Sequence, residues 1–356
     1  MTDVQIATPR PYAAVVTGWV RRNARPLATF DPAAPLDDLA PLGPRVRGAA
    51  VVGVGGTTGG AHELSALTHR ILRYLVEHHG IRALAIEDDW RIGRALDDHV
   101  RTGAGDPRAV LAGAWPPWRT EEVVDVVHWT RTRNEAHPDD PVRIVGLDDA
   151  ALESPDEAER HMADSLVAWQ ERTGTRALYW GEAAHTAVGD LRTVHAPPGP
   201  PMVQRSAGSR LRDHFGPAYV SVGLTFGLGD VPWPVPSPPP ELAEAALGAA
   251  GAAALIDLHA AGPAEVRAWL DAPARLRLVG PRIDPAHDGV RHMTGGSLAG
   301  WFDLIAHVEQ VSPTRPMSQD RGRRGRLPTP GPDMDARARA AARAAPVRHR
   351  SGRGAG

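Results

Sequence analysis

Short apolar segments that end in glycine or in an acidic residue alternate with amphipathic segments through the middle of this chain. The apolar segments are residues 48–56, 81–88, 142–148 and 176–182. Each is bounded by turn residues and is typical of a buried strand. The segment between the first two carries leucine and isoleucine at helical spacing over residues 61–80, and it ends in Gly80, a common helix stop. Strands joined through helices by short links form right-handed parallel crossovers, so the chain is predicted to be an α/β protein with a mostly parallel sheet flanked by helices.

The same alternation continues toward the carboxyl terminus and sets the expected domain limits. Helices are expected at residues 121–134, 155–173, 206–214 and 263–270, and strands at 218–224 and 254–258. The proline-rich residues 231–240 are expected to form a stiff connection. We expect one α/β domain over residues 48–317, preceded by a Pro- and Ala-rich segment at residues 1–47. Residues 318–356 are poor in large apolar side chains and are expected to be a disordered, arginine-rich tail.

The composition excludes several kinds of chemistry. The chain has no cysteine and no lysine, which excludes disulfides, thiolate sites and lysine Schiff bases. It has no apolar run long enough to span a membrane and no amino-terminal secretory pattern, so a cytoplasmic location is expected. The tail carries ten arginines against three aspartates, and because the net charge of the chain is −2, the residues before the tail carry about −9. A body of that charge disfavours nucleic acid as a partner, except for weak contacts through the tail.

Side chains capable of chemistry gather where the predicted strands end. In a parallel sheet the carboxyl ends of the strands meet at one edge, and ligands bind there. At these ends the chain carries Glu87, Asp148, Glu182 and His185. Three carboxylates and an imidazole are also chemically suited to a hard divalent cation, but no spacing in the sequence supports a metal site. We therefore predict neither a metal nor a cofactor.

Several blocks, in order and at similar spacing, resemble the erythromycin esterase family, which includes proteins labelled succinoglycan biosynthesis. The family's strand, turn and helix of the form G-E-x-T-H-G-x-x-E-F is matched by VVGVGGTTGGAHEL at residues 51–64. Its strand ending in G-x-D is matched by VRIVGLD at 142–148, and its strand ending in W-x-H-N-x-H by ALYWGEAAH at 177–185. Further matching blocks lie at residues 69–90, 115–134, 210–230 and 301–314. The resemblance implies the same α/β fold over residues 48–317, without the long helical insertion that the family carries between the last two strands named.

The resemblance also implies an activity and shows what this chain lacks for it. The family is taken to hydrolyse esters, with macrolide lactones as its named substrates, and a Glu and a His of the first block act together, the His activating water as general base. These two positions are Gly56 and Gly59 here. An Arg usual in the next helix is replaced by Thr68, and the first His of the W-x-H-N-x-H strand by Glu182. The ancestral catalytic pair is therefore expected to be lost.

Other acidic and histidine residues remain near the same strand ends. The family positions that survive are Glu63, Glu87 and His185, and a His–Glu pair could be rebuilt with Glu182 or His62. The candidate catalytic residues are thus Glu87, His185, Glu182, His62 and Glu63. Each also has a structural interpretation, because a Glu near a helix start is stabilised by the helix dipole, and the histidines can be exposed or simply packed.

Two functional hypotheses follow. The first is a diverged member of the family without the ancestral hydrolytic pair, which binds a small molecule or peptide in the inherited cleft. The second is an active hydrolase or biosynthetic tailoring enzyme for an ester- or lactone-type substrate, with a role in antibiotic resistance or secondary metabolism, that uses Glu87 and His185.

Overall fold

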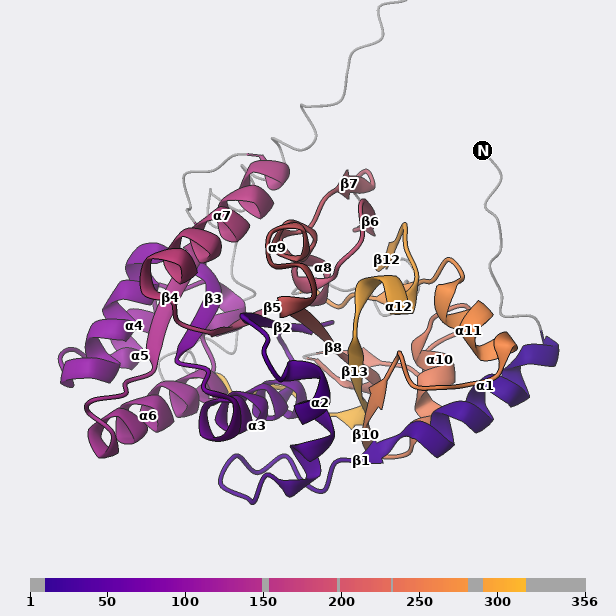
Figure 1. The fold of residues 1–356 in the computed structure, drawn as a ribbon, viewed down its shortest axis with the longest axis horizontal. Coiled ribbons are helices and arrows are strands. Elements are labelled where there is room, and N and C mark those ends of the chain that lie inside the picture. Colours follow the sequence, from indigo (N-terminus) through magenta and orange to yellow (C-terminus); the bar gives the residue numbers. More distant parts are fainter. Residues whose placement is uncertain (1–9, 149–153, 197–198, 232, 281–290, 318–356) are drawn as a thin grey trace, which may run out of the picture.

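A large, mostly parallel sheet organises the molecule (Figure 1). The computed structural model describes residues 10–148, 154–196, 199–231, 233–280 and 291–317. In spatial order the strands are β1 (Arg25–Pro26), β10 (Ala253–Asp257), β13 (Leu304–Val311), β8 (Tyr219–Asp230), β2 (Val51–Gly56), β5 (Ala177–Glu182), β3 (Ala83–Asp89) and β4 (Arg143–Asp148). From β13 to β4 every neighbouring pair is parallel, whereas β10 is antiparallel to β13 and to β1. The predicted α/β architecture is confirmed.

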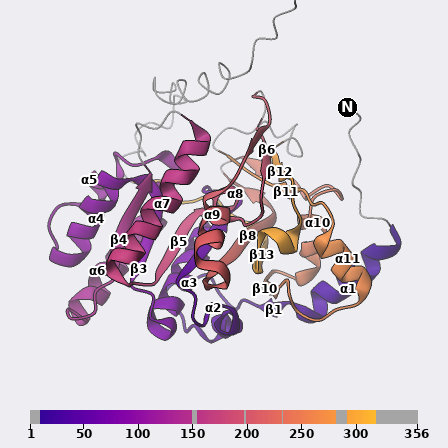
Figure 2. The same cartoon turned by 45° about the horizontal axis from the view of Figure 1, so that its top comes forward.

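Both faces of the parallel strands are buried under helices. The covering helices are α3 (His62–His79), α6 (Glu121–Ala136), α7 (Pro155–Thr173) and α9 (Ala207–Phe215). Along β3, Leu84 and Ile86 pack with α3 and α6, whereas Ala83 and Ala85 pack with α7 and α9. Figures 1 and 2 show α7 and α9 on one side of the sheet and α3 on the other. Because successive side chains of a strand point to opposite faces, a strand covered on both sides needs the near-continuous apolar run seen in the sequence.

The helix ends follow from local chemistry. Helix α3 stops at Gly80 and α7 at Gly174, which adopt left-handed backbone with φ of 67° and 66°. Glycine reaches this region without the penalty that a Cβ atom imposes. At the start of α6 the Thr120 hydroxyl accepts a hydrogen bond from the Val123 amide at 3.3 Å, as an N-cap residue does. These ends agree with the expected helix positions to within about two residues.

Several parts of the fold are not predicted from the sequence, among them strand β13, which pairs parallel with β8 within the large sheet. Helix α4 (Trp90–Thr102) follows β3 directly and packs on β4, where Gly93 lies so close to the backbone of Gly146 that a Cβ atom would stand 2.0 Å from its nitrogen. A second sheet, entirely antiparallel, has the order β11 (Leu276–Arg277), β12 (His292–Thr294), β6 (Arg192–His195) and β7 (Met202–Gln204). The proline-rich connection also differs from expectation, because β9 (Pro234–Val235) pairs antiparallel with the end of β8.

The segment before residue 48 packs on the α/β body. Strand β1 extends the large sheet, and Leu39 and Leu42 are fully buried in the core under α3. Arg70 of α3 is also fully buried, and it donates hydrogen bonds to the Asp38 carboxylate at 2.8 Å and to the Thr29 carbonyl at 2.7 Å. The expected domain limits stay a prediction, and the arginine-rich tail from residue 318 lies outside the described residues. None of the described helices is both long enough and apolar enough to cross a membrane.

Candidate functional site

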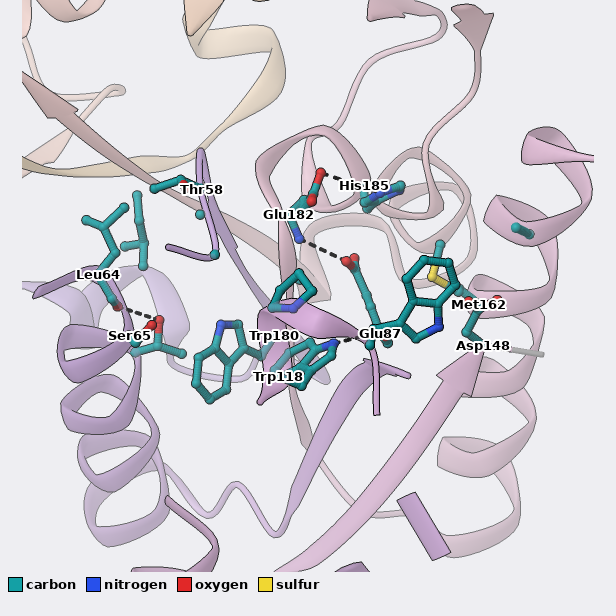
Figure 3. A pocket seen from close by; sticks show the side chains of 18 residues that line it. Thr58, Leu64, Ser65, Glu87, Trp118, Asp148, Met162, Trp180, Glu182 and His185 are labelled. Atoms are coloured by element: carbon teal, nitrogen blue, oxygen red, sulfur yellow. Dashed lines mark hydrogen bonds and ion pairs between the residues drawn. The ribbon is translucent and has the colours of Figure 1, made fainter. Parts of the chain in front are cut away.

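A pocket of about 210 Å³ opens at the carboxyl ends of the parallel strands (Figure 3). Its charged lining residues are Glu87, Asp148, Glu182 and His185. Its apolar walls include Leu64, Trp115, Pro117, Trp118, Met162 and Trp180. The strand ends therefore meet as the sequence predicts, and three of the five candidate residues share one cavity.

Glu87 stands in the pocket with both carboxylate oxygens engaged. Its Oε1 atom accepts a hydrogen bond from the Tyr179 hydroxyl at 2.5 Å, and its Oε2 atom accepts one from the Glu182 amide at 3.0 Å. Burial raises the pKa of Glu87 to about 7, against the opposing effects of the positive His185 and of the Tyr179 hydrogen bond. Near neutral pH this carboxyl group is consequently ready both to take up and to release a proton.

Gly181 creates the space that Glu87 occupies. A Cβ atom built on Gly181 would lie 1.9 Å from Glu87 Oε1 and 2.4 Å from its Cδ. Gly181 precedes Glu182, whose amide binds the same carboxylate. The position of the pocket carboxylate thus depends on a glycine of the neighbouring strand β5.

His185 lies on the short helix α8 (Ala183–Thr186) that follows β5, and its ring pairs with the buried carboxylate of Glu159. Its Nδ1 atom is 2.7 Å from Glu159 Oε1, and its Nε2 atom is 4.0 Å from Glu182 Oε2. Burial alone would lower the pKa of His185, but the negative charges of Glu159, Glu87 and Glu182 outweigh burial and raise it to about 10. At neutral pH the imidazole is therefore a cation, which donates hydrogen bonds but accepts no proton.

Glu159 is central to this arrangement but is not among the candidate residues predicted from the sequence. It lies on α7 with 1% of its surface exposed, one residue after Ala158 of the pocket lining. A signal for it exists, because Glu159 occupies the apolar stripe of α7 together with Met162, Ala163 and Leu166. Acidic residues are almost never fully buried unless they are paired, so a carboxylate on such a stripe indicates an internal partner.

Two tryptophans form one wall of the pocket. The rings of Trp118 and Trp180 meet edge to face, with centroids 5.1 Å apart, and the Trp118 indole donates a hydrogen bond to the Glu87 carbonyl at 3.0 Å. Edge-to-face packing and a satisfied indole N–H hold such a wall rigid. Trp118 belongs to the block at residues 115–134, whereas no pattern in the sequence indicates a pocket role for Trp180.

Gly56 and Gly59 also line the pocket, but the space beside Gly59 is occupied. A Cβ atom on Gly59 would lie 2.8 Å from Pro117 Cβ, and one on Gly56 would lie 3.1 Å from the Thr58 carbonyl oxygen. A histidine at position 59 would therefore require Pro117 to move. Neither Gly56 nor Gly59 adopts the left-handed backbone conformation that only glycine reaches easily.

His62 and Glu63, the other two candidates, lie outside the pocket lining and anchor residues 312–317, here named the C-terminal strap. Glu63 accepts hydrogen bonds from the amide and the hydroxyl of Ser312, both at 2.7 Å. His62 Nδ1 lies 2.6 Å from Oε1 of the buried Glu122, which also accepts a bond from Arg315 Nε at 3.0 Å. The strap thus fastens the start of α3 to the start of α6.

The described ranges contain no group of three acidic or histidine side chains arranged to hold a metal ion. The four charged residues considered for such a site all line the pocket, and Glu87 and His185 also hydrogen-bond to partners within the protein.

Comparisons with known proteins agree with this architecture. A family model described as erythromycin esterase matches residues 76–158 and 149–311. A protein of Bacillus subtilis (strain 168) named putative hydrolase YbfO is 29% identical over 131 residues, which is 36% of this chain and 28% of that protein. The chain thus matches less than a third of that relative's length.

Solved structures extend the similarity to most of the chain. A succinoglycan biosynthesis protein superposes with a TM-score of 0.71 at 20% identity, over 88% of this chain and 100% of the other. A protein from Bacillus cereus gives 0.72 at 21% identity, over 86% and 99% of the two chains. A mutant of the erythromycin esterase EreC in its open conformation gives 0.60 at 12% identity, over 79% and 96%. At these identities the likeness concerns the fold, and together with the family match it places this chain in the erythromycin esterase family.

Proposed function

We propose that this protein is a hydrolase of an ester or lactone bond in a small molecule, and that Glu87 is its general base. The observation that carries the proposal is a pocket-facing carboxyl group whose pKa is raised to about 7 by burial. A base works best when its pKa lies near the working pH, and residues tuned in this way concentrate at active sites. Glu87 would then replace the base that the family keeps at the position of Gly59.

The reaction uses the two charged groups in different ways. The Glu87 carboxylate takes a proton from water while the water oxygen forms a bond to the carbonyl carbon of the ester. Negative charge develops on the carbonyl oxygen, and the His185 cation stabilises it. The bond to the alcohol oxygen then breaks, and the departing oxygen takes the proton from Glu87, which leaves an acid, an alcohol and the ionised carboxylate.

Turnover and its pH dependence test this proposal. Purified protein is incubated with macrolides and with generic esters, and kcat/KM is measured from pH 5 to 9. Because the base must be ionised, we expect kcat/KM to rise with pH through about 7, following the raised pKa of Glu87. We also expect His185→Ala to lose most of the turnover. Activity that is independent of pH in this range, or that survives in His185→Ala, would contradict the assignment.

A second candidate function is ligand binding without hydrolysis. The observation in its favour is the first loop, where Gly56 and Gly59 carry no group able to transfer a proton and Pro117 fills the space beside Gly59. Loss of a positioned general base costs about 10²–10⁴-fold in rate. In this case the protein would bind a small molecule or peptide in the pocket, and no ester in the panel would be turned over.

Restoring the family's Glu and His at Gly56 and Gly59 tests whether this loop can still hold the ancestral catalytic pair. We expect the double variant Gly56→Glu, Gly59→His to gain no hydrolysis and to lose about 1–3 kcal/mol of stability through overpacking against Pro117. Adding Pro117→Gly removes the contacting Cβ atom and should recover part of that loss, as measured by urea unfolding. A double variant that hydrolyses macrolides without the third change would mean that the loop accepts the ancestral pair as it stands.

A further inference from the structure

The buried carboxylate of Glu159 accepts more hydrogen bonds than a single ion pair would supply. Its Oε1 atom accepts hydrogen bonds from His185 Nδ1 at 2.7 Å, from Gln204 Nε2 at 3.1 Å and from the Arg192 guanidinium. Its Oε2 atom accepts one from the Ala207 amide at 2.6 Å. Four donors from four separate elements, α8, β6, β7 and the start of α9, thus converge on one carboxylate.

These donors keep the carboxylate ionised although it is buried. Burial alone would raise the pKa of Glu159, but the positive charges of His185 and Arg192 and the donated hydrogen bonds outweigh burial and hold this pKa below its ordinary value. A fixed negative charge at 2.7 Å from Nδ1 in turn keeps the imidazole of His185 doubly protonated. The second nitrogen, Nε2, is left to face Glu182 beside the pocket.

We propose that Glu159 is the positioning residue of the site, which fixes the ring orientation and the positive charge of His185 so that its Nε2–H group serves negative charge developing on the substrate. The proposal rests on the function proposed above and makes it more specific. Arg192 of β6 and Gln204 of β7 position Glu159 in turn, so the second sheet is connected to the pocket through this carboxylate. This role of Glu159 also explains why helix α7 carries a charged residue on its apolar stripe.

The experiment uses a matched pair of variants, Glu159→Gln and Glu122→Gln. Both glutamates are buried, with 1% and 3% of their surfaces exposed, and both pair a histidine Nδ1 and an arginine. Only Glu159 faces a pocket histidine. In the wild type and in both variants, the charge of the His185 ring is followed by NMR of its carbon-bound protons over pH 5 to 10. The kcat and KM values are measured alongside for any ester that the wild type turns over.

In the wild type we expect His185 to stay charged through pH 8. In Glu159→Gln its pKa should fall by about 2 units or more, kcat should fall by about 10²-fold with little change in KM, and the loss should grow as the ring becomes neutral. Glu122→Gln should lower stability but leave the charge of His185 and the pH profile unchanged.

Two results overturn the proposal. One is a neutral His185 at pH 8 in the wild type, which needs no variant and therefore decides the matter even if Glu159→Gln fails to fold. The other is a His185 that keeps its charge in Glu159→Gln. Both results are read by NMR and need no turnover. Absence of ester hydrolysis would therefore refute the proposed hydrolase function, whereas the role of Glu159 toward His185 is decided by the NMR titration alone.

Discussion

Glu87→Gln is expected to abolish most of the turnover and, at pH 8, to make the protein more stable than the wild type. The catalytic loss follows from removal of the general base and should reach about 10²–10⁴-fold. The gain in stability follows from linkage. The pKa of Glu87 is raised from 4.5 to about 7 on folding, so the unfolded chain ionises between these values while the folded protein does not. Stability is therefore lost as pH rises through this window, and above it the cost is on the order of 3 kcal/mol.

The sign of this effect supplies its own control. Below about pH 4.5 Glu87 is protonated in both states, so the advantage of Glu87→Gln should disappear there. Urea unfolding of both proteins at about pH 3.5 and at pH 8 measures the difference. A variant that is less stable at both pH values would mean that the carboxyl group is a structural partner of Tyr179 rather than a strained catalytic group.

Gly181→Ala is expected to produce a similar catalytic loss with Glu87 still present. The added methyl group would overlap the Glu87 carboxylate, 1.9 Å from Oε1, and would force it away from Tyr179 and from the Glu182 amide. We expect kcat/KM to fall by about 10²-fold or more, as for a misplaced general base, and stability to fall by about 1–3 kcal/mol through overpacking.

The two changes act on one carboxylate, so their effects on activity should not add. In the Glu87→Gln background, Gly181→Ala should cause little further loss of kcat/KM, a coupling that a double-mutant cycle measures. Gly113→Ala is the matched control, because a Cβ atom there would meet its nearest neighbour at an ordinary 3.4 Å. Full additivity of the first two changes would show that Gly181 acts on something other than Glu87.

The sequence predicts those elements whose burial leaves a pattern. Strands covered on both faces are continuous apolar runs, and helices that end in Gly80 or Gly174 carry their own stop, so five of the six strands of the parallel part of the sheet, all but β13, and the covering helices could be placed. The second sheet was not predictable in this way, because its strands are two to four residues long and are defined by their partners rather than by periodicity.

The site was predictable only in part, for a related reason. Glu87 and Glu182 lie near the carboxyl ends of β3 and β5, His185 follows β5, and the strand ends of a parallel sheet meet. His62 and Glu63 are close to the same turn in sequence, but the His62 ring binds Glu122 of α6 and the Glu63 carboxylate binds Ser312 of the C-terminal strap. The partner of Glu63 lies 249 positions away and that of His62 lies 60 positions away, and no local pattern records such contacts.

The C-terminal strap affects the order in which parts of the molecule fold. It joins the turn at Ala61 to Pro313 and the turn at Thr120 to Pro316 by β-bridges. The first turn precedes α3, which contributes pocket-lining residues, and the second follows Trp115, Pro117 and Trp118 of the pocket wall. During synthesis from the amino end, the chain that supplies both turns emerges roughly 200 residues before the segment that ties them together. Contacts of such sequence separation form slowly because the intervening loop must close first. We therefore expect the pocket to be completed late in folding, after the sheet that supports it.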